Sequence, residues 1–131
     1  MIFCDSSFWY ALRVPHDDHH EAARALWKAR YEPVVTSTAI VGETWTLMNT
    51  KLSHRRAVEF IDAIDASNRV SLHHMDDGLE HQAWQWLRQH DERTYSFVDA
   101  TSFALMRELG ITEALAFDGD FAAAGFVELR P

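Results

Sequence analysis

Short apolar runs alternate along the chain with longer segments in which apolar residues recur every three or four positions. A short apolar run bounded by polar residues is typical of a buried strand, and the longer spacing is typical of a helix that covers a sheet. Alternation of this kind predicts an α/β fold with a parallel sheet and helices on both faces. The predicted strands are residues 2–5, 33–36, 70–73, 114–117 and 126–129.

The sequence also indicates where several helices begin and end. Asp17 or Asp18 can cap a helix that runs to about residue 30, and residues 77–80 resemble a capping box before another helix. Residues 96–109 predict a further helix, which Gly110 stops. The helix after residue 38 has an apolar stripe at helical spacing, formed by Val41, Trp45, Met48 and Leu52.

The length and composition are those of one globular domain. With 131 residues, 47% of them hydrophobic, the chain can bury a core, and we expect one domain over residues 1–131. The single cysteine, Cys4, excludes an internal disulfide. No apolar run approaches the roughly 18 residues that span a bilayer, and the N-terminus lacks the basic stretch of a signal peptide. We therefore expect a soluble, cytoplasmic protein with no membrane attachment.

The charge balance limits the partners. With 12 Lys and Arg against 20 Asp and Glu, the formal net charge is −8. An acidic chain is poorly suited to non-specific binding of a nucleic-acid duplex, which depends on Lys and Arg neutralising phosphates. A nucleic-acid substrate stays open if a bound metal supplies the local positive charge.

Four carboxylates stand where a site forms in an α/β protein. Asp5 and Asp118 end two predicted strands. Asp99 lies near the start of a helix, and Glu43 lies among the residues of the apolar stripe. Sites in parallel sheets form at the carboxyl ends of strands, where such acids would repel each other unless a cation compensates. Mg²⁺ prefers oxygen ligands and commonly acts on phosphates, so the acids predict metal-assisted hydrolysis of a phosphodiester.

Each of these acids also has a local structural interpretation. Asp5 could cap the helix that follows it, and Ser96 with Asp99 matches a capping box. Asp118 precedes a glycine, as in many turns. Glu43 could be a solvated helix residue. From spacing alone, both interpretations of each acid stay open.

Four segments that contain these acids resemble a known family. They are Phe3-Cys4-Asp5-Ser6-Ser7, Val41-Gly42-Glu43-Thr44, Ser96-Phe97-Val98-Asp99-Ala100-Thr101-Ser102 and Ala116-Phe117-Asp118-Gly119-Asp120-Phe121. In their order and spacing they are similar to the PIN domain, and more narrowly to the ribonuclease toxins of bacterial VapBC-type toxin–antitoxin pairs. One such segment alone is weak evidence for the family, whereas four in the family's order are fairly specific to it. The resemblance runs from Met1 to the end of the chain.

The resemblance implies a single PIN-like domain, with a five-stranded parallel sheet in the order 3-2-1-4-5, that acts as a metal-dependent endoribonuclease. Mg²⁺, or Mn²⁺ in its place, would activate a water for attack on an RNA phosphate and leave 5′-phosphate and 3′-hydroxyl ends. Ser7 and Thr101 would support the ligands, and Asp120, two residues beyond the last acid, is a ligand or a bystander. The residues that the resemblance places around the metal are Asp5, Glu43, Asp99 and Asp118.

The resemblance also implies partners, namely RNA as the substrate, a small antitoxin whose tail covers the acidic pocket, and a second copy in a homodimer. Arg13, close to Asp5 in the sequence, is the residue that we expect to contact RNA. The alternative is a non-catalytic PIN-like module that binds protein or RNA through a vestigial acidic pocket, and the presence of all four acids argues against it. A zinc enzyme is disfavoured, because the H-E-x-x-H pattern that begins at His20 has Arg24 in place of its second histidine.

Overall fold

Five short strands pair in parallel at the centre of the computed structural model, which describes residues 1–131. They form one sheet in the order β3-β2-β1-β4-β5, so the predicted order is confirmed. Phe3 pairs with Val35 on one side and with Ala114 on the other, which places β1 in the middle. The strands are β1 (Ile2–Cys4), β2 (Val34–Ser37), β3 (Val70–His73), β4 (Glu113–Leu115) and β5 (Val127–Glu128).

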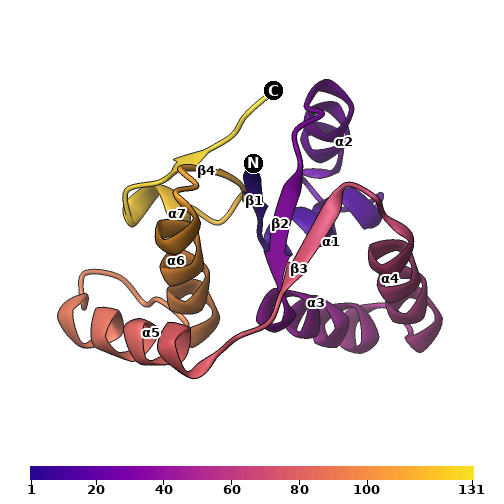
Figure 1. Ribbon diagram of the computed structural model, residues 1–131. Coiled ribbons are helices and arrows are strands. Elements are labelled where there is room, and N and C mark those ends of the chain that lie inside the picture. The colour runs from indigo at the N-terminus through magenta and orange to yellow at the C-terminus, as the bar shows by residue number, and fades with distance from the viewer.

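Helices cover both faces of the sheet, as the alternating pattern predicts. Figure 1 shows α5, α6 and α7 on one side of the strands and α1 to α4 on the other. The direction of strand addition reverses between β1 and β4, and the reversal sends the helices to opposite faces because crossovers are right-handed. The helices are α1 (Ser6–Arg13), α2 (His20–Ala29), α3 (Thr38–Lys51), α4 (His54–Ala66), α5 (Asp77–Gln89), α6 (Phe97–Leu109) and α7 (Asp120–Ala123).

The helix α7 is the element that the sequence pattern does not predict. It has only four residues, too few for an apolar period to appear. Its position comes from tertiary packing, because Phe121 is fully buried between Phe3 of β1 and Phe103 of α6. Gly119, with a φ of 83°, turns the chain into this helix. As a result, Asp118 lies in the loop three residues beyond the end of β4. The prediction that Asp118 ends a strand is therefore wrong.

Two predicted helix starts are wrong by a few residues. The helix α2 begins at His20 without a side-chain cap, because the Asp17 carboxylate instead accepts the backbone N–H of His19. The helix α5 is capped by Asp76, which accepts the N–H of Leu79, so the predicted box over residues 77–80 does not form. Both structural starts lie within a few residues of the predicted ones.

The apolar stripe predicted for α3 is rotated by about one residue. The buried side chains of this helix are Ile40, Thr44 and Met48, while Val41 and Trp45 are half-buried. Thr44 can be buried because its hydroxyl donates to the carbonyl oxygen of Ile40, 2.8 Å away.

None of the helices combines the length and the apolar character that a membrane-spanning helix needs.

Candidate metal centre

Three of the four predicted acids meet at the reversal point of the sheet. Asp5 follows β1, Asp99 lies in the first turn of α6, and Asp118 follows β4. Each offers a carboxylate oxygen, and the three oxygens lie within 4.8 Å of one another. They come together because β1 and β4 are neighbours in the sheet, so their carboxyl ends share one edge.

Asp5 is buried and held by the helix that it caps. Its Oδ2 accepts the backbone N–H of Ser7 at 3.1 Å and the Ser7 hydroxyl at 2.7 Å. The same hydroxyl oxygen accepts the N–H of Phe117 at 3.0 Å. Ser7 therefore connects the Asp5 carboxylate to the loop that carries Asp118, which is the geometry of a residue that supports a ligand.

Asp99 has both of the roles considered for it, since it lies in the cluster and in a capping box. Its Oδ2 accepts the N–H of Ser96 at 3.0 Å, and the Ser96 hydroxyl accepts the N–H of Asp99 at 2.9 Å. The box fixes the carboxylate while leaving an oxygen for the cluster. Thr101, predicted as a supporting residue, is fully buried and donates its hydroxyl to the carbonyl of Val98, so it bonds its own helix and no carboxylate.

Asp118 is exposed, and its loop is held by one local hydrogen bond and by a residue from a distant segment. The backbone N–H of Asp120 donates to Asp118 Oδ1 at 3.1 Å. Arg93, in the loop before α6, donates from Nε to Asp120 Oδ1 at 2.7 Å and from Nη2 to the Asp118 carbonyl at 3.1 Å. Asp120 thus lies outside the three-acid cluster and is paired with an arginine, so it acts on Asp118 through the backbone. Arg93 is the contributor that sequence reasoning missed.

Glu43 lies at the side of the cluster and is not one of the three converging acids. It is half-buried on α3, and its Oε2 accepts the hydroxyl of Ser6 at 3.1 Å. Ser6 is the first residue of α1, so this hydrogen bond ties α3 to the helix that Asp5 caps. The negative charge of Asp118 is one of the causes that raise the pKa of the Glu43 carboxyl, after its burial.

The electrostatics of the cluster oppose full ionisation. Burial, with the nearby charge of Asp118, raises the pKa of Asp5 to about 8. Burial, with the charges of Asp120 and Asp118, raises the pKa of Asp99 to about 6. Loss of solvent also raises the pKa of Glu43. A divalent cation would relieve this repulsion, and an all-oxygen donor set without Cys or His suits Mg²⁺ or Mn²⁺.

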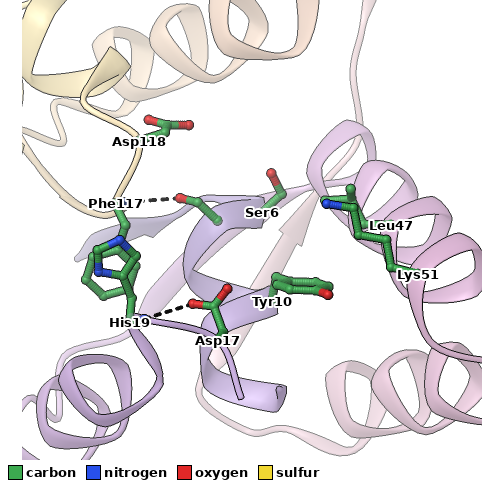
Figure 2. A pocket seen from close by; sticks show the side chains of 9 residues that line it. Ser6, Tyr10, Asp17, His19, Leu47, Lys51, Phe117 and Asp118 are labelled. Atoms are coloured by element: carbon green, nitrogen blue, oxygen red, sulfur yellow. Dashed lines mark hydrogen bonds between the residues drawn. The ribbon is translucent and has the colours of Figure 1, made fainter. Parts of the chain in front are cut away.

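A pocket of about 340 Å³ opens beside the acids (Figure 2). It lies between the start of α1, the loop before α2, the end of α3 and the loop after β4. Of the residues that line it, Lys51 is the only lysine or arginine. The lining residues are Ser6, Ser7, Tyr10, Asp17, His19, Leu47, Lys51, Phe117 and Asp118.

The structure does not bring Arg13 to this site. Arg13 ends α1, whereas Asp5 caps the opposite end of that helix. Its neighbours there are apolar, because it lines a second pocket with Trp9, Trp27 and Phe60. Nearness in sequence therefore does not place Arg13 beside the acids, where Lys51 lines the pocket, and the contact of Arg13 with RNA stays a prediction.

Comparison with known proteins identifies the class. The model of the PIN domain matches residues 2–127, and the chain therefore belongs to the PIN domain family. Over 131 residues it is 56% identical to the "23S rRNA-specific endonuclease VapC20" of Mycobacterium tuberculosis, in strains CDC 1551 / Oshkosh and ATCC 25618 / H37Rv. These alignments cover 100% of this chain and 99% of each relative.

Solved structures agree with this family. The crystal structure of Mycobacterium tuberculosis VapC20, described as a "Sarcin-Ricin loop cleaving toxin", superposes with a TM-score of 0.95 at 54% identity, and the match covers 100% of both chains. FitAcB from Neisseria gonorrhoeae has a TM-score of 0.67 at 16% identity, over 98% of this chain and 96% of that one, and shows likeness of fold alone. The resemblance to PIN domain ribonuclease toxins that the four sequence segments carry is confirmed.

Proposed function

We propose that this protein is a Mg²⁺-dependent endoribonuclease toxin that cuts 23S rRNA in the sarcin–ricin loop. One observation carries the proposal: three carboxylate oxygens converge within 4.8 Å in a chain that is 56% identical, over its whole length, to a 23S rRNA-specific endonuclease. The convergence supports the chemistry, and the full-length similarity supports the substrate.

Asp5, Asp99 and Asp118 are the residues that would hold the metal, with Glu43 as a fourth carboxylate at the side. The donor set fits Mg²⁺, because hard oxygen ligands are present and the carboxylates repel one another without a cation. When bound, such an ion lowers the pKa of a coordinated water and stabilises negative charge on a phosphoryl oxygen. Mn²⁺ has similar preferences and can take its place.

The chain's own residues keep the carboxylates in place for this chemistry. Ser7 fixes the Asp5 carboxylate, and the capping box fixes that of Asp99. Arg93 and the Asp120 amide hold the loop of Asp118. Groups held in place before the reaction need not reorganise as charge develops on the phosphate. Glu43, with a raised pKa at its half-buried carboxyl group, is suited to take a proton from an attacking water.

The proposal includes partners and a location. We take residues 1–131 as one PIN-like domain that works in the cytoplasm, where ribosomes are found. The resemblance to VapBC-type toxins supports a small antitoxin that covers the acidic pocket and a homodimer of the toxin.

The test is cleavage of RNA by the purified protein, free of any partner. Intact bacterial ribosomes and protein-free 23S rRNA are incubated with Mg²⁺, Mn²⁺ or EDTA, and primer extension maps the new ends. We expect one cut in the sarcin–ricin loop, sensitive to EDTA and absent in Asp5→Asn. Asp62→Asn, the same change at an exposed position on α4, is the matched control and should cut like the unchanged protein.

Two results would overturn parts of the proposal. Discrete EDTA-sensitive cuts elsewhere would keep the nuclease and reject the sarcin–ricin loop as its target. No cleavage of either substrate, together with no heat of metal binding in a calorimeter, would reject the nuclease in favour of the non-catalytic module.

A further inference from the structure

The pocket beside the acids has an aromatic wall. The rings of His19 and Phe117 are stacked, with centroids 4.5 Å apart and planes 5° from parallel. Figure 2 shows the two rings overlapping on one side of the pocket, with Tyr10 and the residues of α3 on the other. His19 is exposed, so part of its ring is free to contact a ligand.

Contacts from three segments fix this wall. The backbone N–H of His19 donates to Asp17 Oδ2 at 3.0 Å, which holds the loop between α1 and α2. The backbone N–H of Phe117 donates to the Ser7 hydroxyl at 3.0 Å, and the Phe117 ring packs on Phe8 with a centroid distance of 5.6 Å. The wall is therefore formed in advance and linked through Ser7 to the Asp5 carboxylate.

A single cation faces the pocket from the other side. Lys51 ends α3, and its ammonium group lies 5.8 Å from the centroid of the Tyr10 ring. The carboxylates of Asp118 and Asp17 also line the pocket, and the chain carries a net charge of −8. In this acidic setting Lys51 is the lining residue best suited to meet an RNA phosphate.

We propose that this pocket is a nucleotide subsite of the ribonuclease. It takes one unpaired nucleobase, next to the scissile bond, against the His19–Phe117 wall, while Lys51 contacts a phosphate of the same strand. The pocket volume of about 340 Å³ lies in the range of small-molecule sites. Proteins that read unpaired RNA stack its bases on aromatic and histidine side chains and neutralise its phosphates with cations. This inference rests on the proposed function, because it assumes an RNA substrate.

The test pairs changes in the wall with changes in the RNA. The probe is a fluorescent hairpin RNA with the sarcin–ricin loop sequence, together with copies in which one loop nucleotide near the cut is abasic. His19→Ala removes one ring, and His19→Phe keeps an aromatic ring there. His16→Ala alters an exposed histidine that does not line the pocket. Lys51→Met and Lys51→Arg form the corresponding pair for the cation.

We expect His19→Ala to weaken binding of the hairpin about tenfold. The loss should appear as a higher KM in Mg²⁺ and as a higher Kd, measured by fluorescence anisotropy in EDTA. The affinity for the metal should not change. His19→Phe should restore binding, and His16→Ala should have no effect. One abasic position should weaken binding by the unchanged protein about tenfold. The same position should hardly affect binding by His19→Ala, because the ring that stacks on that base is already missing. Lys51→Met should weaken binding of every hairpin and reduce the salt dependence of binding. Lys51→Arg, which keeps the charge, should change neither.

The outcomes separate this inference from the proposed function. If His19→Ala cuts and binds the hairpin like the unchanged protein, and no abasic position couples to it, the subsite is wrong and the nuclease stands. If the unchanged protein binds but never cuts, while the coupling to His19 is present, the subsite stands and the nuclease falls. If neither binding nor cleavage occurs, both fall.

Discussion

The buried acids of the candidate metal centre and its more exposed ones are held by different kinds of contacts. Asp5 and Asp99 are only 1% and 8% exposed, and each is fixed by hydrogen bonds within three residues of itself, at the start of a helix. Asp118 is exposed, and its loop is clamped by Arg93 from a segment about 25 residues earlier. Glu43 depends on Ser6, which is 37 residues away.

This difference separates two ways of building one site. Local caps form as soon as their helices form, so the buried pair is fixed by secondary structure. The exposed pair depends on tertiary contacts, beside the one local hydrogen bond from the Asp120 N–H to Asp118. We therefore expect changes in the buried pair to abolish the chemistry, and changes around the exposed pair to weaken metal binding by degrees.

The largest effect should follow from Asp5→Asn or Asp99→Asn. Either change removes a charged ligand but keeps an oxygen that accepts the capping N–H, so the fold should persist. We expect cleavage to fall by about 10³-fold or more, since a metal supplies several kcal/mol to such reactions. Single-turnover cleavage measures this, and circular dichroism checks the fold. A wild-type rate in both variants would remove these acids from the site.

A smaller effect should follow from Arg93→Gln, which releases the loop of Asp118. We expect metal affinity to fall roughly tenfold, as is typical when a group that supports a ligand is lost. The melting temperature should change little, because ion pairs this exposed contribute under about 1 kcal/mol. Arg88→Gln, an exposed arginine on α5, is the control. Equal metal affinity in both variants would show that Asp118 needs no such clamp.

The smallest effect should be a pH dependence of stability in the metal-free protein. Folding raises the pKa of Asp5 from 3.8 to about 8, so the folded state binds its proton more tightly than the unfolded state does. The contribution of the protonated Asp5 carboxyl to the stability of the folded state is full below about pH 4 and is lost as the pH rises towards 8. We expect the melting temperature to fall between pH 5 and 8. The fall should be smaller in Asp5→Asn and in excess Mg²⁺. A steeper fall in Asp5→Asn would contradict the assigned cause.

Local signals explain what the sequence could predict. The strand order, the capping box at Ser96 and the position of Asp5 at the end of the first strand, correct to within one residue, each follow from short stretches or from the family's spacing. The convergence of Asp5, Asp99 and Asp118 then follows from topology, because neighbouring strands end at one edge.

Contacts between distant segments explain what it could not. Arg93 and Asp120 are 27 residues apart, and no periodicity marks either as a partner. The His19–Phe117 stack joins two loops, which carry no repeating pattern. Arg13 shows that nearness in sequence does not bring a side chain to the acids, because eight residues of helix separate it from Asp5 by roughly 12 Å along the axis.

The most direct test of the metal centre is calorimetric titration of Mg²⁺ and Mn²⁺ into the metal-free protein at pH 7, in two buffers with different heats of ionisation. The raised pKa values of Asp5 and Asp99 mean that a metal must displace protons from the cluster. We predict binding with net proton release in the unchanged protein, and neither binding nor release in Asp5→Asn. Equal binding by both proteins, or binding without proton release, would contradict a metal centre built on these carboxylates.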